Sequence, residues 1–166
     1  TYATNSGSTA EVAAAIAAEL ARAGHSARVF PINAAPDPAD FDAVVIGAPM
    51  ILGWHPAARR YLKRHQQQLA ARPVALFACA MRLTRAPGET LPPLLLNLDD
   101  SLVSSPARAG RLTLKERFTT IAHYLRPMLG AAPQVKPVSV AFFNGKLETY
   151  RLKWWQAIFV MLVVQA

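Results

Sequence analysis

The stretch Thr1-Tyr2-Ala3-Thr4-Asn5-Ser6-Gly7-Ser8-Thr9 decides the fold that this sequence predicts. It combines the end of a strand, a turn and the start of a helix. Four of its residues carry side-chain hydroxyls within six positions: Thr4, Ser6, Ser8 and Thr9. Gly7 lets the backbone of the turn bend close to a ligand. Apolar residues at four-residue spacing (Val12, Ile16, Leu20) then predict a helix over residues 10–22.

The turn before this helix has the composition of an anion-binding site. The N–H groups at a helix N-terminus lack intrahelical partners, and together with the helix dipole they attract negative charge. Ser8 and Glu11 have the spacing of a capping box, so Ser8 is the expected N-cap. The alternative is an ordinary capped helix without a ligand, because N-caps favour the same residue types.

Hydrophobic periodicity along the remaining chain alternates between strand and helix patterns. Strands are predicted at residues 27–32, 43–48, 73–80 and 135–143, and helices at 56–69, 114–129 and 152–164. With a first strand that ends at the turn, this alternation favours one α/β domain over residues 1–166. We expect a doubly wound, five-stranded parallel sheet in the order 2-1-3-4-5, with the ligand beyond the carboxyl ends of the strands.

A stretch of about thirty residues, 81–110, follows the fourth predicted strand and shows no clear periodicity. Loops of this length in compact domains are usually lids, binding segments or disordered. The part from Leu91 to Leu96 is too apolar for a free linker. It is expected to pack on the body of the domain, to cover a ligand or to touch a membrane.

The composition limits the chemistry of the chain. Cys79 is the single cysteine, which excludes an internal disulfide and a cysteine metal cluster, and no metal site is expected. We interpret it as a buried small hydrophobe without a redox role. The formal net charge of +8 favours an anionic partner such as lipid head groups, nucleic acid or an acidic substrate, unless it reflects an arginine-rich genome. The basic helix face of Arg59, Arg60, Lys63 and Arg64 has no interleaved aromatics, so nucleic acid is not the expected partner.

Two further loops are expected to meet the turn at the ligand site. The loop after the third strand contains Pro49, Met50, Ile51, Leu52, Gly53, Trp54 and His55. Trp54 is a candidate for stacking on a flat ring, and the alternative is that it fills the gap between loop and helix. His55 is a candidate proton donor or substrate contact, and the alternative is a helix cap.

The loop after the fourth strand begins with Ala80, Met81 and Arg82. Arg82 and Arg85 are candidates for holding a substrate carboxylate by paired hydrogen bonds, and the alternative is plain exposure to solvent.

The last segment, 151–166, has an amphipathic start and an apolar end. Arg151 and Lys153 stand beside Trp154 and Trp155, ahead of the apolar run at residues 157–164. Eight apolar residues are too few to cross a bilayer, which needs about twenty. Tryptophans beside cations predict an interfacial membrane anchor. The alternative is a buried last helix of the domain.

Thr4, Ser6, Gly7 and Thr9 match in order the phosphate loop of flavodoxins, which has the form Thr/Ser-x-Thr/Ser-Gly-x-Thr. The motifs of dinucleotide folds and of P-loops are missing. The resemblance implies a flavodoxin-like fold that binds FMN, with its phosphate on Thr4, Asn5, Ser6, Gly7, Ser8 and Thr9. Its isoalloxazine ring would lie between residues 49–54 and 80–82.

Later segments resemble the bacterial quinone-dependent protoporphyrinogen IX dehydrogenases of flavodoxin type. They are Gly47-Ala48-Pro49 with Gly53-x-His55, the long insert, and Phe143-x-Gly145-Lys146-Leu147 with Arg151-x-x-Trp154-Trp155. This resemblance implies that FMN accepts hydride from a porphyrinogen in haem synthesis and passes electrons to a membrane quinone. It also implies a cytoplasmic protein that lies peripherally on the inner face of the cell membrane.

The insert departs from that enzyme, because it is apolar and proline-rich where the enzyme is more polar and basic. Two alternatives therefore stay open, a flavodoxin-type electron carrier and a flavodoxin-like interaction module without FMN. Only three residues precede the turn, so we expect that the native protein is longer at both ends.

Overall fold

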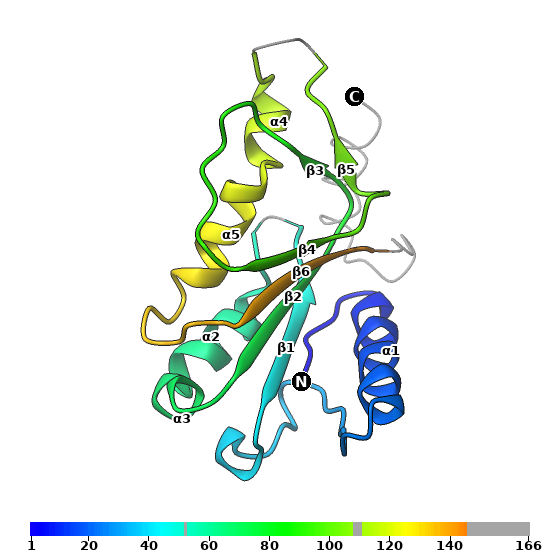
Figure 1. The fold of residues 1–166 in the computed structure, drawn as a ribbon, viewed down its shortest axis with the longest axis vertical. Coiled ribbons are helices and arrows are strands. Elements are labelled where there is room, and N and C mark those ends of the chain that lie inside the picture. Colours follow the sequence, from blue (N-terminus) through cyan, green and yellow to red (C-terminus); the bar gives the residue numbers. More distant parts are fainter. Residues whose placement is uncertain (52, 108–110, 146–166) are drawn as a thin grey trace.

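A computed structural model of the chain describes residues 1–51, 53–107 and 111–145, and its main feature is a parallel sheet (Figure 1). The strands of this sheet lie in the order β1-β2-β6-β4. Their bounds are Val44–Pro49 for β1, Val74–Ala80 for β2, Ser139–Asn144 for β6 and Leu95–Leu98 for β4. The predicted apolar runs at 43–48 and 73–80 thus form the two central strands, as expected for strands buried on both faces.

The amino-terminal residues extend this sheet beyond β1. Isolated parallel bridges join Tyr2 to Gly47 on one side and to Pro31 on the other. The Ala3 N–H donates to the Gly47 carbonyl at 2.9 Å, and the Tyr2 N–H donates to the Phe30 carbonyl at 3.1 Å. The predicted order 2-1-3-4-5 is therefore confirmed, and the predicted strand at 27–32 contributes only the bridge at Pro31.

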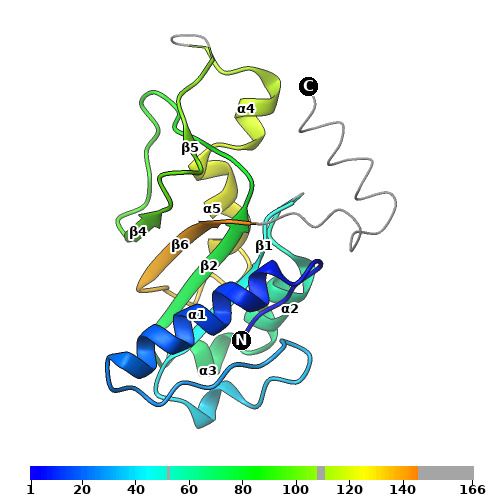
Figure 2. The ribbon, with the colours of Figure 1, turned by 90° about the vertical axis from the view of Figure 1, so that its right-hand side faces the viewer.

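Helices cover both faces of the sheet, as a doubly wound fold requires (Figures 1 and 2). Helix α1 (Ser8–Arg22) lies on one face. The other face carries α2 (Pro56–Arg64), α3 (Gln66–Ala70) and α5 (Ile121–Leu129). The larger hydrophobic core lies under these three helices, and a smaller cluster around Ala13, Phe77 and Cys79 lies under α1.

Two predicted helices are each divided in two. The helix predicted at 56–69 is interrupted at His65, between α2 and α3. The helix predicted at 114–129 consists of α4 (Leu114–Phe118) and α5, because the Thr120 hydroxyl caps a new helix by accepting from the His123 N–H at 3.2 Å. The helical periodicity over 114–129 predicts that Leu114 and Phe118 face inward with the other apolar residues of this segment. This prediction is wrong, since 72% and 57% of their surfaces are exposed.

The insert after β2 is more regular than its sequence predicts. Its residues 95–98 form β4, which pairs in parallel with β6 and extends the sheet. Strand β3 (Leu83–Thr84) pairs with β5 (Val103–Ser104) in a small second sheet. Leu91, Leu94 and Leu96 pack against the core, so the expectation that this apolar stretch packs on the body is confirmed. A short 3-10 helix, η1 (Pro38–Asp40), lies in the connector before β1.

Candidate functional site

A small pocket of about 20 Å³ lies beyond the carboxyl ends of β1 and β2. The three loops that were expected to converge there all contribute to it. Its lining residues are Asn5, Ser6, Ser8, Pro49, Met50, Ile51, Cys79, Ala80, Met81 and Gly145. Two backbone hydrogen bonds fix this edge: the Met50 N–H donates to the Cys79 carbonyl and the Gly145 N–H to the Ala80 carbonyl, each at 2.9 Å.

The turn at the start of α1 has a geometry that only glycine adopts readily. Gly7 is the N-cap, and its φ of 98° lies in the left-handed region. The Gly7 N–H donates to Thr4 Oγ1 at 2.9 Å, which closes the turn. Ser8 is the first helical residue, so the expected Ser8–Glu11 capping box is wrong. The N-cap Gly7 has no side chain, so the cap position itself supplies no side-chain oxygen to the first N–H groups of α1.

The hydroxyl of Thr9 lies under this turn. Thr9 is fully buried, and within the described part of the chain its Oγ1 has no hydrogen bond of ordinary geometry. Burial raises the pKa of the nearby Cys79 thiol, and the interaction of this thiol with the Thr9 hydroxyl lowers it in part. A buried hydroxyl without a partner is costly unless a ligand or water satisfies it. Together with the glycine N-cap of α1, this weakly paired hydroxyl fits a turn that holds the phosphate of FMN.

Cys79 itself is a buried free thiol, as predicted. Its raised pKa keeps it protonated and unreactive at neutral pH. It lines the pocket together with Gly145, and neither was predicted as a site residue. Their position at the carboxyl ends of strands β2 and β6 is the signal that could have identified them as site residues.

The loop after β1 turns its aromatic residue into the core. Trp54 is 1% exposed and its indole N–H donates to the Phe77 carbonyl at 3.3 Å. The stacking interpretation of Trp54 is therefore wrong for this structure, because the ring fills the gap between loop and helix. Met50 is also buried, but it contributes to the pocket. Gly53 has a φ of 102° in the same loop, and Leu52 lies outside the described residues.

His55 serves as the N-cap of α2 and does not line the pocket. Its Nδ1 accepts from the Ala57 N–H at 3.2 Å. Burial and the nearby Arg60 guanidinium lower its pKa, which favours the neutral ring that this acceptor role needs. The capping alternative is therefore the one observed, and the structure gives no support to His55 as a proton donor.

Arg82 and Arg85 are exposed and lie outside the lining of the pocket. Arg82 Nε donates to Ser104 Oγ at 3.1 Å, so this side chain is directed toward the insert. Met81 is the residue of this loop that reaches the pocket. Residues 151–155, where Arg151, Lys153, Trp154 and Trp155 were expected to contact a membrane, lie outside the described residues.

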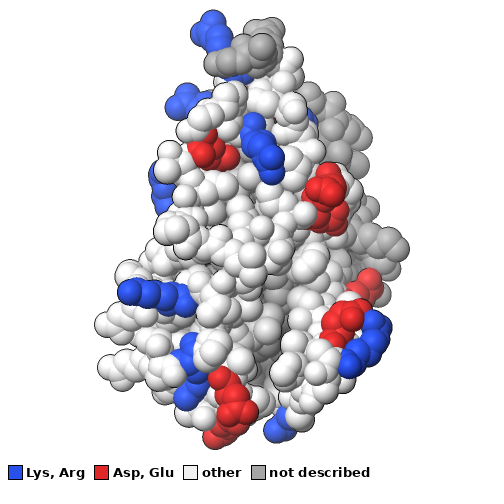
Figure 3. Space-filling model, in the orientation of Figure 1, with Lys and Arg blue, Asp and Glu red and all other residues white. Residues whose placement is uncertain are grey.

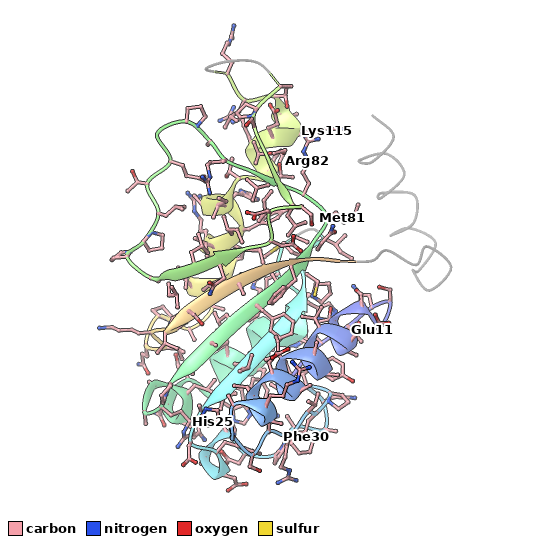
Figure 4. All side chains as sticks on the ribbon, turned by 45° about the vertical axis from the view of Figure 1, so that its right-hand side comes forward. Glu11, His25, Phe30, Met81, Arg82 and Lys115 are labelled. Atoms are coloured by element: carbon pink, nitrogen blue, oxygen red, sulfur yellow. The ribbon has the colours of Figure 1, made fainter. Side chains whose placement is uncertain are left out.

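A larger cavity of about 530 Å³ lies between α1 and the connector after it. It is lined by Ile16, Leu20, His25, Arg28 and Phe41, among others. Figure 4 shows His25 at one end of the molecule and Met81 toward the other. The smaller pocket is the candidate site, because parallel α/β sheets bind ligands at the carboxyl ends of their strands.

The sheet order, the covering helices and the position of the glycine turn at the start of α1 together define a doubly wound α/β protein. A family model described as a flavodoxin domain matches residues 1–166, so the chain belongs to the flavodoxin domain family. Domains of this family generally bind FMN and take part in electron transfer.

Neither a curated protein nor a solved structure matches the chain. Within the described residues, no helix has the length and apolar character needed to cross a membrane. The same residues contain no cluster of three or more His, Cys, Asp or Glu side chains that could hold a metal ion.

Proposed function

We propose that this protein is an FMN-dependent oxidoreductase whose cofactor binds at the pocket formed by the turn at residues 4–9. The observation that carries the proposal is the left-handed glycine turn at the start of α1, whose N-cap Gly7 has no capping side chain and lies beside the pocket residues Ser6 and Ser8. Bound FMN supplies the capacity to accept and release one or two electrons. The chain supplies the binding surface for it.

Each part of the pocket has a role in this proposal. The hydroxyls of Thr4, Ser6 and Ser8 and the amides of the turn hold the phosphate. Met50 and Met81 provide apolar surface for the flat ring from two sides of the pocket. Gly145 leaves room there, because a Cβ at this position would lie 3.3 Å from the Cβ of Cys79.

We infer further that the reduced substrate is a small organic molecule of the porphyrinogen type and that the electron acceptor is a membrane quinone. The resemblance to protoporphyrinogen IX dehydrogenases supports this choice. The net charge of +8 supports it as well, since cations attract both carboxylated substrates and anionic membranes. A cytoplasmic protein with peripheral contact to the inner face of the membrane fits such a reaction.

The first experiment is the absorption spectrum of the purified protein. We expect a flavin spectrum, or its appearance after FMN is added. Gly7→Val should abolish binding, because φ near 98° excludes a β-branched residue. Gly24→Val is the matched control, since Gly24 also has a positive φ (87°) but lies at the other end of α1. A colourless protein that takes up no FMN would refute the proposal.

A second experiment separates the enzyme from the electron carrier. Under anaerobic conditions, protoporphyrinogen should bleach the flavin absorption and a soluble quinone should restore it. Bleaching by a flavodoxin reductase but not by protoporphyrinogen would favour the carrier.

A further inference from the structure

Helix α4 presents its apolar residues to solvent. Leu114 and Phe118 are four positions apart, so they lie on the same side of the helix, and they are 72% and 57% exposed. Monomeric proteins usually turn such residues inward. The orientation of α4 therefore needs a cause.

The cause is the buried carboxylate of Glu116, which is only 4% exposed. Its oxygens accept from the Ala107 N–H at 2.6 Å and from the Thr113 N–H at 2.7 Å. The Thr113 hydroxyl also bonds to it and closes a capping box. These hydrogen bonds direct the Glu116 side chain toward the interior. Leu114 and Phe118 lie on the opposite side of α4 and therefore face solvent.

Basic residues flank the exposed pair. Arg111, Lys115 and Arg117 are all exposed on or next to α4. Figure 3 shows several Lys and Arg side chains at the end of the molecule that the insert forms. Because Glu116 is engaged in hydrogen bonds, the outer surface of α4 itself combines apolar and cationic groups.

This surface lies at the same end of the molecule as the candidate pocket. The Thr84 N–H donates to the Thr119 carbonyl at 2.8 Å, and the hydroxyls of the same two residues are 2.9 Å apart. Thr84 follows the pocket residue Met81 by three positions. Figure 4 shows Met81, Arg82 and Lys115 in succession from the pocket toward α4.

We propose that α4 binds the surface of a bilayer that contains anionic lipid. Leu114 and Phe118 enter the head-group region, and Arg111, Lys115 and Arg117 contact lipid phosphates. A second copy of the chain fits this surface poorly, because the cations would face one another and stable protein interfaces bury about 800 Å² per partner. This inference rests on the peripheral membrane contact of the proposed function and assigns that contact to α4. It depends neither on FMN binding nor on a quinone acceptor.

The test measures sedimentation of the full chain with phosphatidylcholine vesicles, with and without phosphatidylglycerol. The wild type should bind only the anionic vesicles. The double variant Leu114→Ser/Phe118→Ser should lose about tenfold in affinity, since two partly inserted apolar side chains are removed. Leu95→Ser/Val138→Ser is the matched control, because these residues are 64% and 57% exposed elsewhere on the fold. It should bind as the wild type does.

A second pair of variants tests the cations. Lys115→Gln/Arg117→Gln should weaken binding and make it less sensitive to salt, whereas Arg59→Gln/Arg60→Gln on α2 should have a smaller effect. Wild-type affinity in Leu114→Ser/Phe118→Ser would overturn the proposal and leave the contact to another segment. Self-association of the wild type in the absence of vesicles, if the substitutions Leu114→Ser/Phe118→Ser abolish it, would also overturn the proposal. FMN uptake in each variant, followed by absorption, shows separately whether the proposed function stands.

Discussion

The ring of Phe77 occupies the space that a side chain on Gly47 would need. The two residues are direct partners in the parallel pair of β1 and β2. A Cβ built on Gly47 would lie 1.8 Å from Cζ of Phe77. Phe77 is also in edge contact with Phe143, at a centroid distance of 5.9 Å, so it is held on both sides. Because Gly47 has no side chain, the Phe77 ring can occupy the smaller hydrophobic cluster under α1.

Gly47→Ala should destabilise the protein by about 1–3 kcal/mol, because the Phe77 ring must leave the position that the added methyl group would take. Urea unfolding followed by circular dichroism measures the change. Phe77→Leu should recover part of the loss in the double variant. Gly24→Ala is the control, since nothing lies within 4 Å of its Cβ and only backbone strain of about 1 kcal/mol is expected. A Gly47→Ala protein as stable as wild type would contradict the packing described above.

Trp54→Phe should lower the free energy of unfolding by about 2 kcal/mol and leave FMN affinity close to the wild-type value. The smaller ring leaves a cavity and loses the hydrogen bond to the Phe77 carbonyl. Met81→Ala should show the reverse, because Met81 lines the pocket and is partly exposed. Titration with FMN and urea unfolding of both variants make the comparison. A large loss of FMN affinity in Trp54→Phe would restore the stacking interpretation.

Glu116→Gln should loosen α4, because a neutral amide accepts the bonds from Ala107 and Thr113 more weakly. These bonds lower the pKa of the Glu116 carboxyl. A lowered pKa means that its stabilising contribution is complete above the ordinary value of about 4.3 and is lost as the pH falls through the folded-state pKa. Urea midpoints between about pH 3 and 6 should therefore fall less steeply in Glu116→Gln than in wild type.

His55 should add a second pH dependence near neutrality. Burial and Arg60 lower its pKa below the ordinary 6.5. The unfolded chain then binds the proton first, so stability is complete above pH 6.5 and declines as the pH falls from there to the folded-state pKa. His55→Asn keeps an N-cap side chain and should remove this decline. His25→Asn, at an exposed position, should leave it unchanged.

Cys79 should react slowly with iodoacetamide in the native protein, because burial raises the pKa of its thiol and blocks access. Labelling followed by mass spectrometry should become fast in urea. Since Cys79 lines the candidate pocket, added FMN should slow the native reaction further. Fast labelling of the native protein that FMN does not slow would contradict the position of the Cys79 thiol in the pocket.

The sequence by itself determined the central strands and the turn that precedes α1. Strands β1 and β2 are continuous apolar runs because helices cover them on both faces, and such runs are recognisable without any tertiary information. The hydroxyl turn is equally local, since the left-handed Gly7 and its neighbours lie within a few positions of one another. Both depend on interactions between residues close in sequence or on burial alone.

Only the tertiary structure decided the roles of Trp54, Leu114 and Phe118. A lone tryptophan after a strand fits a core or a cofactor equally well, and the place of Trp54 in the larger hydrophobic core, with its indole N–H bonded to the Phe77 carbonyl, settled the choice. Helical periodicity showed that Leu114 and Phe118 share a side of α4, but not which way that side faces. The cap at Thr120 separates α4 from α5, and the bonds from Ala107 and Thr113 to Glu116 set its rotation. Such orientations depend on contacts between separate elements, which the local pattern of a sequence does not contain.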